Sequence, residues 1–170
     1  GAIRKDSEAG PRPLIAQIDP RSPLVEAYRS MRTNLQYLGV ATEEGKAKSV
    51  VITSAGPAEG KSTTAANLAI VMSDTGARVA LVDADLRKPT IAKTMGIEGA
   101  VGLSDVLIGR TPLKDAIQSW GRRGLSVLPA GPIPPNPSEL LGAPVMRTVL
   151  GELVEGFDYV KDMQIAGVQQ

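Results

Sequence analysis

Short apolar runs alternate with helical patterns along most of this chain. Residues 50–53, 78–82 and 125–128 are rich in β-branched and aliphatic side chains, which is typical of strands that are buried on both faces. Residues 61–74 fit a helix that Gly76 closes. Strands that alternate with helices predict an α/β fold with a parallel sheet and right-handed crossovers.

The remaining pattern predicts one domain behind an extended arm. Residues 1–24 carry four prolines and scattered charge, so we expect an arm there and a domain over 25–170. Ser22 and Pro23 are a helix N-cap and a first helical residue, and that helix continues to about Leu38. We also expect three short helices, at residues 89–95, 103–108 and 112–120. A proline-rich loop over 129–144, a helix over 145–153 and a strand from 157 would complete the domain.

A phosphate-binding loop is predicted between the first strand and the next helix. The run Ser54-Ala-Gly-Pro-Ala-Glu-Gly-Lys-Ser62 places small residues and Gly-Lys-Ser between a strand and a helix, the context that this motif requires. Its backbone N–H groups would surround a polyphosphate at the helix N-terminus. Ala55 replaces the first glycine of the usual pattern. The nucleotide-binding residues would be Gly56, Pro57, Ala58, Glu59, Gly60, Lys61, Ser62 and Thr63.

Each polar residue at the end of this loop has an expected role. Lys61 would reach the β- and γ-phosphates, and the hydroxyl of Ser62 would bind Mg²⁺. The alternative is a chance Gly-Lys-Ser in an ordinary loop. The strand pattern before the loop and the helix pattern after it favour the phosphate-binding interpretation.

Two carboxylates follow the second predicted strand. Asp83 and Asp85 stand two residues apart, so they would share a face of an extended chain. Ligands of open α/β sheets bind at the carboxyl ends of the strands, so both would face the nucleotide and its metal. The alternative is a polar loop with an aspartate that caps the next helix.

Composition excludes several kinds of chemistry. The chain has 170 residues, no cysteine and no histidine, so thiol chemistry, a histidine base and a histidine-ligated metal are excluded. Its net charge of +1 gives no support for a nucleic-acid partner. No signal peptide or membrane-spanning run is visible. Because the chain begins at Gly1, we expect a piece excised from a longer protein or a tagged one.

Taken together, the motifs resemble those of the bacterial tyrosine kinases. Val82-Asp-Ala-Asp-Leu-Arg87 is similar to the Walker A′ motif of that family. Glu26, Arg29 and Arg32 match its oligomerisation motif, although an exposed helix face with an intrahelical ion pair is the alternative. The segments 102–109 and 134–141 resemble two further family stretches, so the resemblance runs from about Ser22 to Val160.

The resemblance implies a function and partners. It implies a P-loop NTPase-like parallel sheet flanked by helices, and an ATP-dependent protein-tyrosine autokinase that uses ATP/ADP and Mg²⁺. Asp83 and Asp85 would surround the Mg²⁺, which Ser62 also binds, and the incoming hydroxyl. Of the two, Asp83 would orient or deprotonate the tyrosine hydroxyl and Asp85 would support the metal, so that Lys61, Asp83 and Asp85 form the catalytic set. A homo-oligomer such as a ring is implied, with a membrane-embedded activator of the polysaccharide co-polymerase type that can be fused upstream. The setting would be the cytoplasmic face of the plasma membrane and exopolysaccharide biosynthesis.

The pattern breaks near the end of the chain. Lys161 and Asp162 follow Val160 where the family continues an apolar strand toward a Walker B aspartate, and Asp162 lies one residue short of that position. No cluster of acceptor tyrosines is present. We therefore expect a weak or inactive kinase whose C-terminal part is incomplete. One alternative is a nucleotide-switch ATPase of the partitioning kind, although such proteins carry a signature lysine at the position that Gly56 occupies in this chain. The other is a catalytically impaired nucleotide-binding scaffold.

Overall fold

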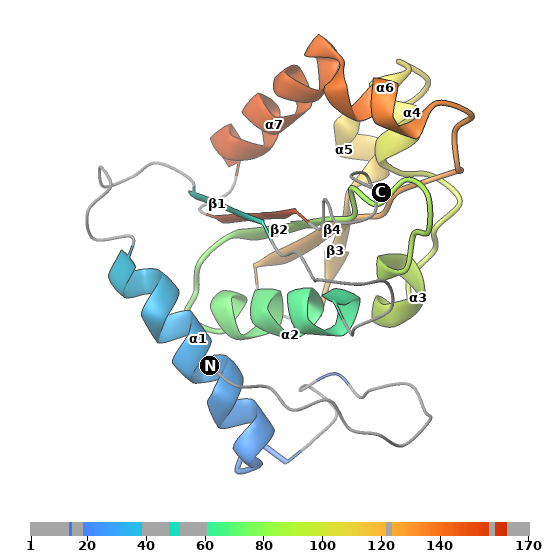
Figure 1. Cartoon of the computed structure of the whole chain (residues 1–170). Coiled ribbons are helices and arrows are strands. Elements are labelled where there is room, and N and C mark those ends of the chain that lie inside the picture. Colours follow the sequence, from blue (N-terminus) through green and yellow to red (C-terminus); the bar gives the residue numbers. More distant parts are fainter. Residues whose placement is uncertain are drawn as a thin grey trace.

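A five-stranded sheet between two layers of helices forms the fold in the computed structural model (Figure 1). The structure describes residues 14, 19–38, 48–51, 61–121, 124–156 and 159–162. In chain order its elements are α1 (Pro23–Leu38), β1 (Lys48–Val51), α2 (Lys61–Ser73), β2 (Val79–Val82), α3 (Ile91–Met95), α4 (Leu103–Leu107), α5 (Leu113–Ala116), β3 (Gln118–Trp120), β4 (Leu125–Leu128), α6 (Pro137–Gly142), α7 (Pro144–Gly156) and β5 (Tyr159–Asp162).

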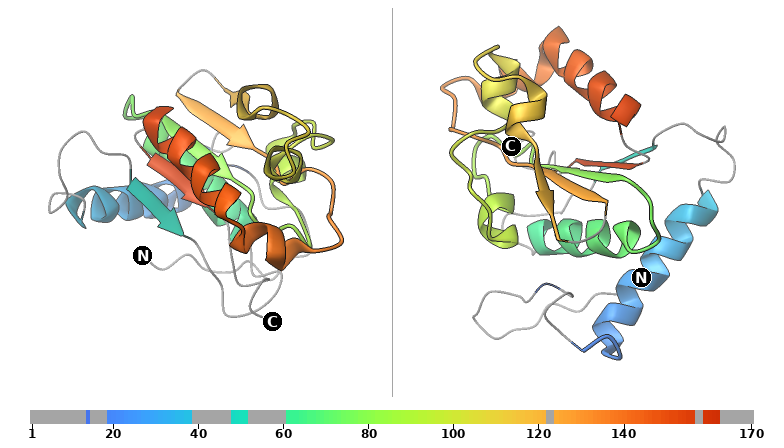
Figure 2. Two further views of the ribbon diagram at one scale, coloured as in Figure 1. Left: turned by 90° about the horizontal axis from the view of Figure 1, so that it is seen from above. Right: turned by 180° about the vertical axis from the view of Figure 1, so that it is seen from behind.

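The strands lie in the order β1-β5-β2-β4-β3, and all neighbours are parallel except β3 and β4. The α/β fold with a parallel sheet flanked by helices is therefore confirmed. The single short helix expected over 112–120 is wrong, because the segment forms α5 and then the edge strand β3. Ile117 ends α5 with extended backbone angles, and β3 then pairs antiparallel with β4 (Figure 2).

Each face of the sheet has its own hydrophobic core. Val79 and Leu81 of β2 belong to the α2-side core, which also contains the apolar residues of α2 and Ile91 of α3. Ala80 and Val82 belong to the α7-side core, together with residues of α4 and α7. Since both faces of β2 are covered, all four of its residues are buried. This explains why its sequence is continuously apolar instead of alternating.

Helix α1 packs outside α2 and not on the sheet (Figure 1). Val25 and Tyr28 of α1 are buried in the α2-side core, and Leu14 of the predicted arm lies in the same core. Helix α2 is therefore covered on two sides, and residues 65–73 are all buried, as expected for a helix that is apolar all round. Tyr28 is 2% exposed, which makes it a core residue and not an accessible phosphate acceptor.

The helix ends follow the predicted signals. The Ser22 Oγ accepts the backbone N–H of Leu24 at 3.3 Å, and Pro23 begins α1. Gly76 follows α2 with a φ of +89° and donates its N–H to the Ser73 carbonyl, a left-handed termination that glycine adopts without strain. Among the described residues, no helix is long and apolar enough to cross a bilayer.

Candidate nucleotide and phosphotransfer site

The start of α2 forms one side of the candidate site. Strand β1 ends at Val51 and α2 begins at Lys61, so a strand and a helix flank the predicted loop segment. Residues 52–60, which include Gly56, Pro57, Ala58, Glu59 and Gly60, lie outside the described part, as does the side chain of Lys61. Ser62 and Thr63 are half-buried in the first turn of α2.

Asp83 is fixed by three backbone N–H groups. It directly follows β2 and is completely buried. Its Oδ1 accepts the N–H of Asp85 at 3.0 Å, and its Oδ2 accepts those of Thr90 and Ile91, both at 3.1 Å. Burial raises the pKa of Asp83 to about 6, although the three N–H donors act in the opposite direction. A carboxyl group with this pKa changes protonation close to neutral pH.

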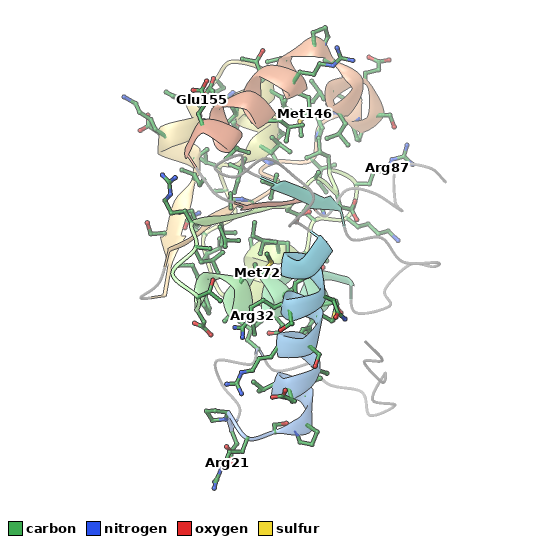
Figure 3. All side chains as sticks on the ribbon, turned by 90° about the vertical axis from the view of Figure 1, so that its left-hand side faces the viewer. Arg21, Arg32, Met72, Arg87, Met146 and Glu155 are labelled. Carbon is green, nitrogen blue, oxygen red and sulfur yellow. The ribbon has the colours of Figure 1, made fainter. Side chains whose placement is uncertain are left out.

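Asp85 shapes the loop that follows. Its Oδ1 accepts the backbone N–H groups of Arg87 at 3.2 Å and Lys88 at 3.1 Å, and the residue is half-buried. This is the side-chain-to-backbone bonding by which aspartate closes turns. The Nη2 of Arg87 donates to the Oγ of Ser138 in α6 at 3.0 Å. The loop is thereby connected to the proline-rich segment 134–141 (Arg87 is labelled in Figure 3).

A contact between two hydroxyl groups joins the two halves of the site. The Oγ of Ser62 in α2 is hydrogen-bonded to the Oγ1 of Thr90, which precedes α3. Figure 1 shows the start of α2 beside α3 on the same side of the molecule. Sequence reasoning missed Thr90, because a threonine before a short helix normally indicates only a cap. The structure therefore brings Ser62 close to the loop that Asp83 and Asp85 organise.

The donor groups present fit Mg²⁺ bound with a nucleotide. Ser62, Asp83 and Asp85 supply only oxygen atoms, the ligands that this ion prefers. In the part of the chain that the structure describes, no three acidic, histidine or cysteine side chains cluster closely enough to hold a metal alone. Mg²⁺ usually retains several waters and takes the remaining ligands from substrate phosphates, so a sparse protein set is what such a site requires.

Strand β5 lies between the two strands that lead into the site. It pairs with β1 on one side and β2 on the other, and Asp162 is in register with Val51 and Val82. Asp83 follows one residue after Val82, so Asp162 is out of phase with it by one position. The side chain of Asp162 lies outside the described part.

The three charged residues of α1 do not share one environment. Glu26 and Arg29 form an exposed ion pair at 3.8 Å, and the Nη1 of Arg29 also reaches the Pro20 carbonyl at 3.4 Å. The Nη1 of Arg32 instead donates to the carbonyl of Val71 in the last turn of α2, at 2.9 Å. Arg32 thus bonds within its own chain, at the interface of α1 with α2 (Figure 3).

Comparisons with known proteins identify the family. A family model described as ParA, NUBPL iron-transfer P-loop NTPase, matches residues 46–128. Tyrosine-protein kinase YwqD of Bacillus subtilis is 46% identical over 149 residues, which are 88% of this chain and 62% of YwqD. The crystal structure of the chimerical protein CapA2B2 superposes with a TM-score of 0.81 at 34% identity, over 92% of this chain and 70% of that chain. The chain belongs to the bacterial tyrosine kinase family.

Other relatives differ mainly in length. Tyrosine-protein kinase etk of Escherichia coli K12 is 35% identical over 87% of this chain, but the match spans only 20% of etk. The solved kinase domain of that protein has a TM-score of 0.81 at 34% identity, over 89% of this chain and 58% of that domain. This chain thus spans less than two thirds of both named relatives and corresponds to the kinase part of the longer one.

Proposed function

We propose that this chain binds Mg·ATP and transfers the γ-phosphoryl group to tyrosine, as part of a kinase that regulates surface polysaccharide polymerisation and export. The observation that carries the proposal is the junction of the two motifs: Ser62 at the start of α2 contacts Thr90, whose backbone N–H is held by Asp83. A nucleotide at the N-terminus of α2 would therefore lie beside the carboxylates at the end of β2. Membership of the tyrosine kinase family supports the same activity.

The nucleotide is assigned to the loop from Gly56 to Thr63. Backbone N–H groups in this loop and at the N-terminus of α2 would hold the phosphates, and Lys61 would place its ammonium group at the β- and γ-phosphates. Ser62 and Asp85 would hold Mg²⁺, with Asp83 behind them. When bound, the ion would neutralise charge on the transferring phosphoryl group.

Asp83 is assigned as the group that orients or deprotonates the acceptor. A carboxyl with a pKa of about 6 is suited to this task, since a general base works best when its pKa is near the working pH. The tyrosine oxygen would form a bond to the γ-phosphorus while the bond from that phosphorus to the β,γ-bridging oxygen breaks. The bridging oxygen would leave with ADP, and the phenolic proton would pass to the carboxylate of Asp83.

The experiment uses the variant Lys61→Met. Calorimetry should show that this variant binds ATP at least tenfold more weakly, because it lacks the point charge at the phosphates. Mass spectrometry should show phosphate transfer from Mg·ATP to a tyrosine-bearing peptide by the unmodified chain and none by the variant. Unchanged ATP affinity in Lys61→Met would contradict the assignment of the loop. Full transfer by Asp83→Asn would contradict the role of the carboxylate.

A nucleotide-switch ATPase is the second candidate. The ParA family model matches residues 46–128, and the cell division ATPase MinD of Pyrococcus furiosus superposes with a TM-score of 0.58 at 31% identity. That likeness covers 72% of this chain and is weaker than the likeness to the kinase domains. The candidate predicts ATP hydrolysis coupled to dimerisation, with no label on the peptide, so the same assay separates the two functions.

The remaining assignments concern assembly and place. Glu26 and Arg29 have exposed side chains on α1 and would contact a neighbouring subunit. Arg32 would hold α1 against α2 through its hydrogen bond to the Val71 carbonyl. The resemblance to the family is the basis for three further assignments: a homo-oligomer, a membrane-embedded activator and a position at the cytoplasmic face of the plasma membrane. Since the chain carries no tyrosine cluster and Asp162 is out of phase with Asp83, autophosphorylation of this chain alone should be weak. An acceptor peptide supplied separately should restore measurable transfer.

A further inference from the structure

The hydroxyl of Thr90 is diverted from the role that its position suggests. Thr90 is the N-cap residue of α3, yet its side chain makes no capping hydrogen bond. Threonine at an N-cap usually accepts a backbone N–H of the first helical turn. Here the Oγ1 is hydrogen-bonded to the Oγ of Ser62 in α2 instead. The contact joins residues 28 positions apart in the sequence and links two separate motifs.

The backbone of Thr90 is held in place independently of this hydroxyl. Its N–H and that of Ile91 both donate to the Oδ2 of Asp83, at 3.1 Å. Its carbonyl accepts the N–H of Thr94 at 2.9 Å, and Ile91 is fully buried in the α2-side core. The position of Oγ1 beside Ser62 is therefore set by the buried carboxylate and by core packing, so removing the hydroxyl should leave the fold intact.

The expected role of Ser62 requires a partner of this kind. A hydroxyl group has one proton to donate and lone pairs to accept with. When the Ser62 oxygen gives a lone pair to a divalent cation, its proton must point elsewhere and needs an acceptor. The Oγ1 of Thr90 is in contact with the Ser62 oxygen and can accept that proton, which would turn the lone pair of Ser62 away from Thr90.

We propose that Thr90 is a positioning residue that orients the Ser62 hydroxyl for the metal of the bound nucleotide. This inference rests on the proposed function, because it assumes that Ser62 is the metal-binding hydroxyl of the loop. It adds a specific prediction: Thr90 supports the metal-dependent part of nucleotide affinity and contributes little to the binding of phosphates without metal.

The test compares ADP binding with and without Mg²⁺. Calorimetry would measure the Kd of ADP in excess Mg²⁺ and in EDTA for the unmodified chain, Thr90→Val, Thr90→Ser and Thr94→Val. Valine has the shape of threonine but no hydroxyl, whereas serine keeps it. Thr94→Val is the matched control, since Thr94 is half-buried in the same short helix. Thermal unfolding of each variant would verify that the fold is retained.

The expected result is selective. Thr90→Val should weaken Mg·ADP binding about fivefold to tenfold, the effect of losing one hydrogen bond in a binding site, with affinity in EDTA changed less than twofold. Thr90→Ser and Thr94→Val should bind as the unmodified chain does. Equal weakening in both conditions would indicate a merely structural role and would overturn the inference, as would wild-type Mg·ADP affinity in Thr90→Val. If the unmodified chain failed to bind ADP at all, the proposed function itself would fail.

Discussion

Arg29 and Arg32 offer a direct test of how α1 is attached, because they lie one turn apart in the same helix and differ in their partners. The perturbation is the replacement of each by alanine. Arg32 donates to the carbonyl of Val71 at 2.9 Å in a partly buried position. Arg29 forms an exposed pair with Glu26 at 3.8 Å. The two substitutions remove the same side chain from one helix, so their difference reports the environment.

The expected costs differ severalfold. A hydrogen bond from a charged donor contributes about 1.5–3 kcal/mol, and a cation at a helix C-terminus adds about 0.3–1 kcal/mol. Val71 lies in the last turn of α2, so both contributions apply to Arg32. We expect Arg32→Ala to lower the free energy of unfolding by about 2–3 kcal/mol. An exposed pair at this spacing contributes about 0.2–0.5 kcal/mol, which is the expected cost of Arg29→Ala.

The assay is chemical denaturation followed by circular dichroism at two protein concentrations tenfold apart. A contact within the chain stabilises the monomer, so the cost of Arg32→Ala should not change with concentration. A contact between subunits would make it change, because assembly stabilises the folded state by mass action. Equal costs for the two variants, or an Arg32 effect present only at the higher concentration, would refute the intrachain role of Arg32.

Three further predictions follow from the same structure. Because Asp83 holds its proton to about pH 6 when folded and only to about 3.8 when unfolded, unfolding between these values releases a proton. Denaturant unfolding at a series of pH values should therefore show the free energy of unfolding falling by about 3 kcal/mol relative to Asp83→Asn as pH rises from about 3 to about 7, with about 2 kcal/mol of that loss between pH 4 and 6. A Cβ at Gly102 would overlap the Pro129 carbonyl, so urea denaturation should show Gly102→Ala lowering the free energy of unfolding by roughly 1–3 kcal/mol. A Cβ at Gly151 in α7 meets nothing within 4 Å, so Gly151→Ala should raise that free energy by about 0.5–1 kcal/mol. Light scattering should show Arg29→Glu shifted toward the monomer while its circular dichroism spectrum remains that of the folded chain, and an unshifted oligomer would exclude Arg29 from the interface.

The main strands and helices could be predicted because local signals and burial agree. Both faces of β2 are covered, so its apolar run is a strand signal that no neighbouring element contradicts. The segment 112–120 was harder to predict. Its strand is three residues long and is defined by antiparallel pairing with β4, a partner that local sequence does not reveal. Edge strands of this length have no periodicity to detect.

Residues of the candidate site could be predicted where the motif fixes a residue type, but not where the fold supplies a contact. The pair Asp83 and Asp85 is visible from its place after a buried strand. Thr90 is not, because its proximity to Ser62 depends on where α3 packs against α2. Asp83 also does more than its motif indicates: its carboxylate accepts the backbone N–H groups of Thr90 and Ile91, so it builds the turn that precedes α3.

The same distinction explains the charged residues of α1. Spacing alone places Glu26, Arg29 and Arg32 on neighbouring positions of one helix face, and it treats them as equivalent. Helix α2 makes them unequal, because its carbonyl at Val71 accepts a hydrogen bond from Arg32. Reversing the charge of both arginines would therefore disturb the attachment of α1 as well as any subunit contact. A loss of assembly in such a double variant could be assigned to the interface only if Arg29→Glu alone, with Arg32 intact, reproduced it.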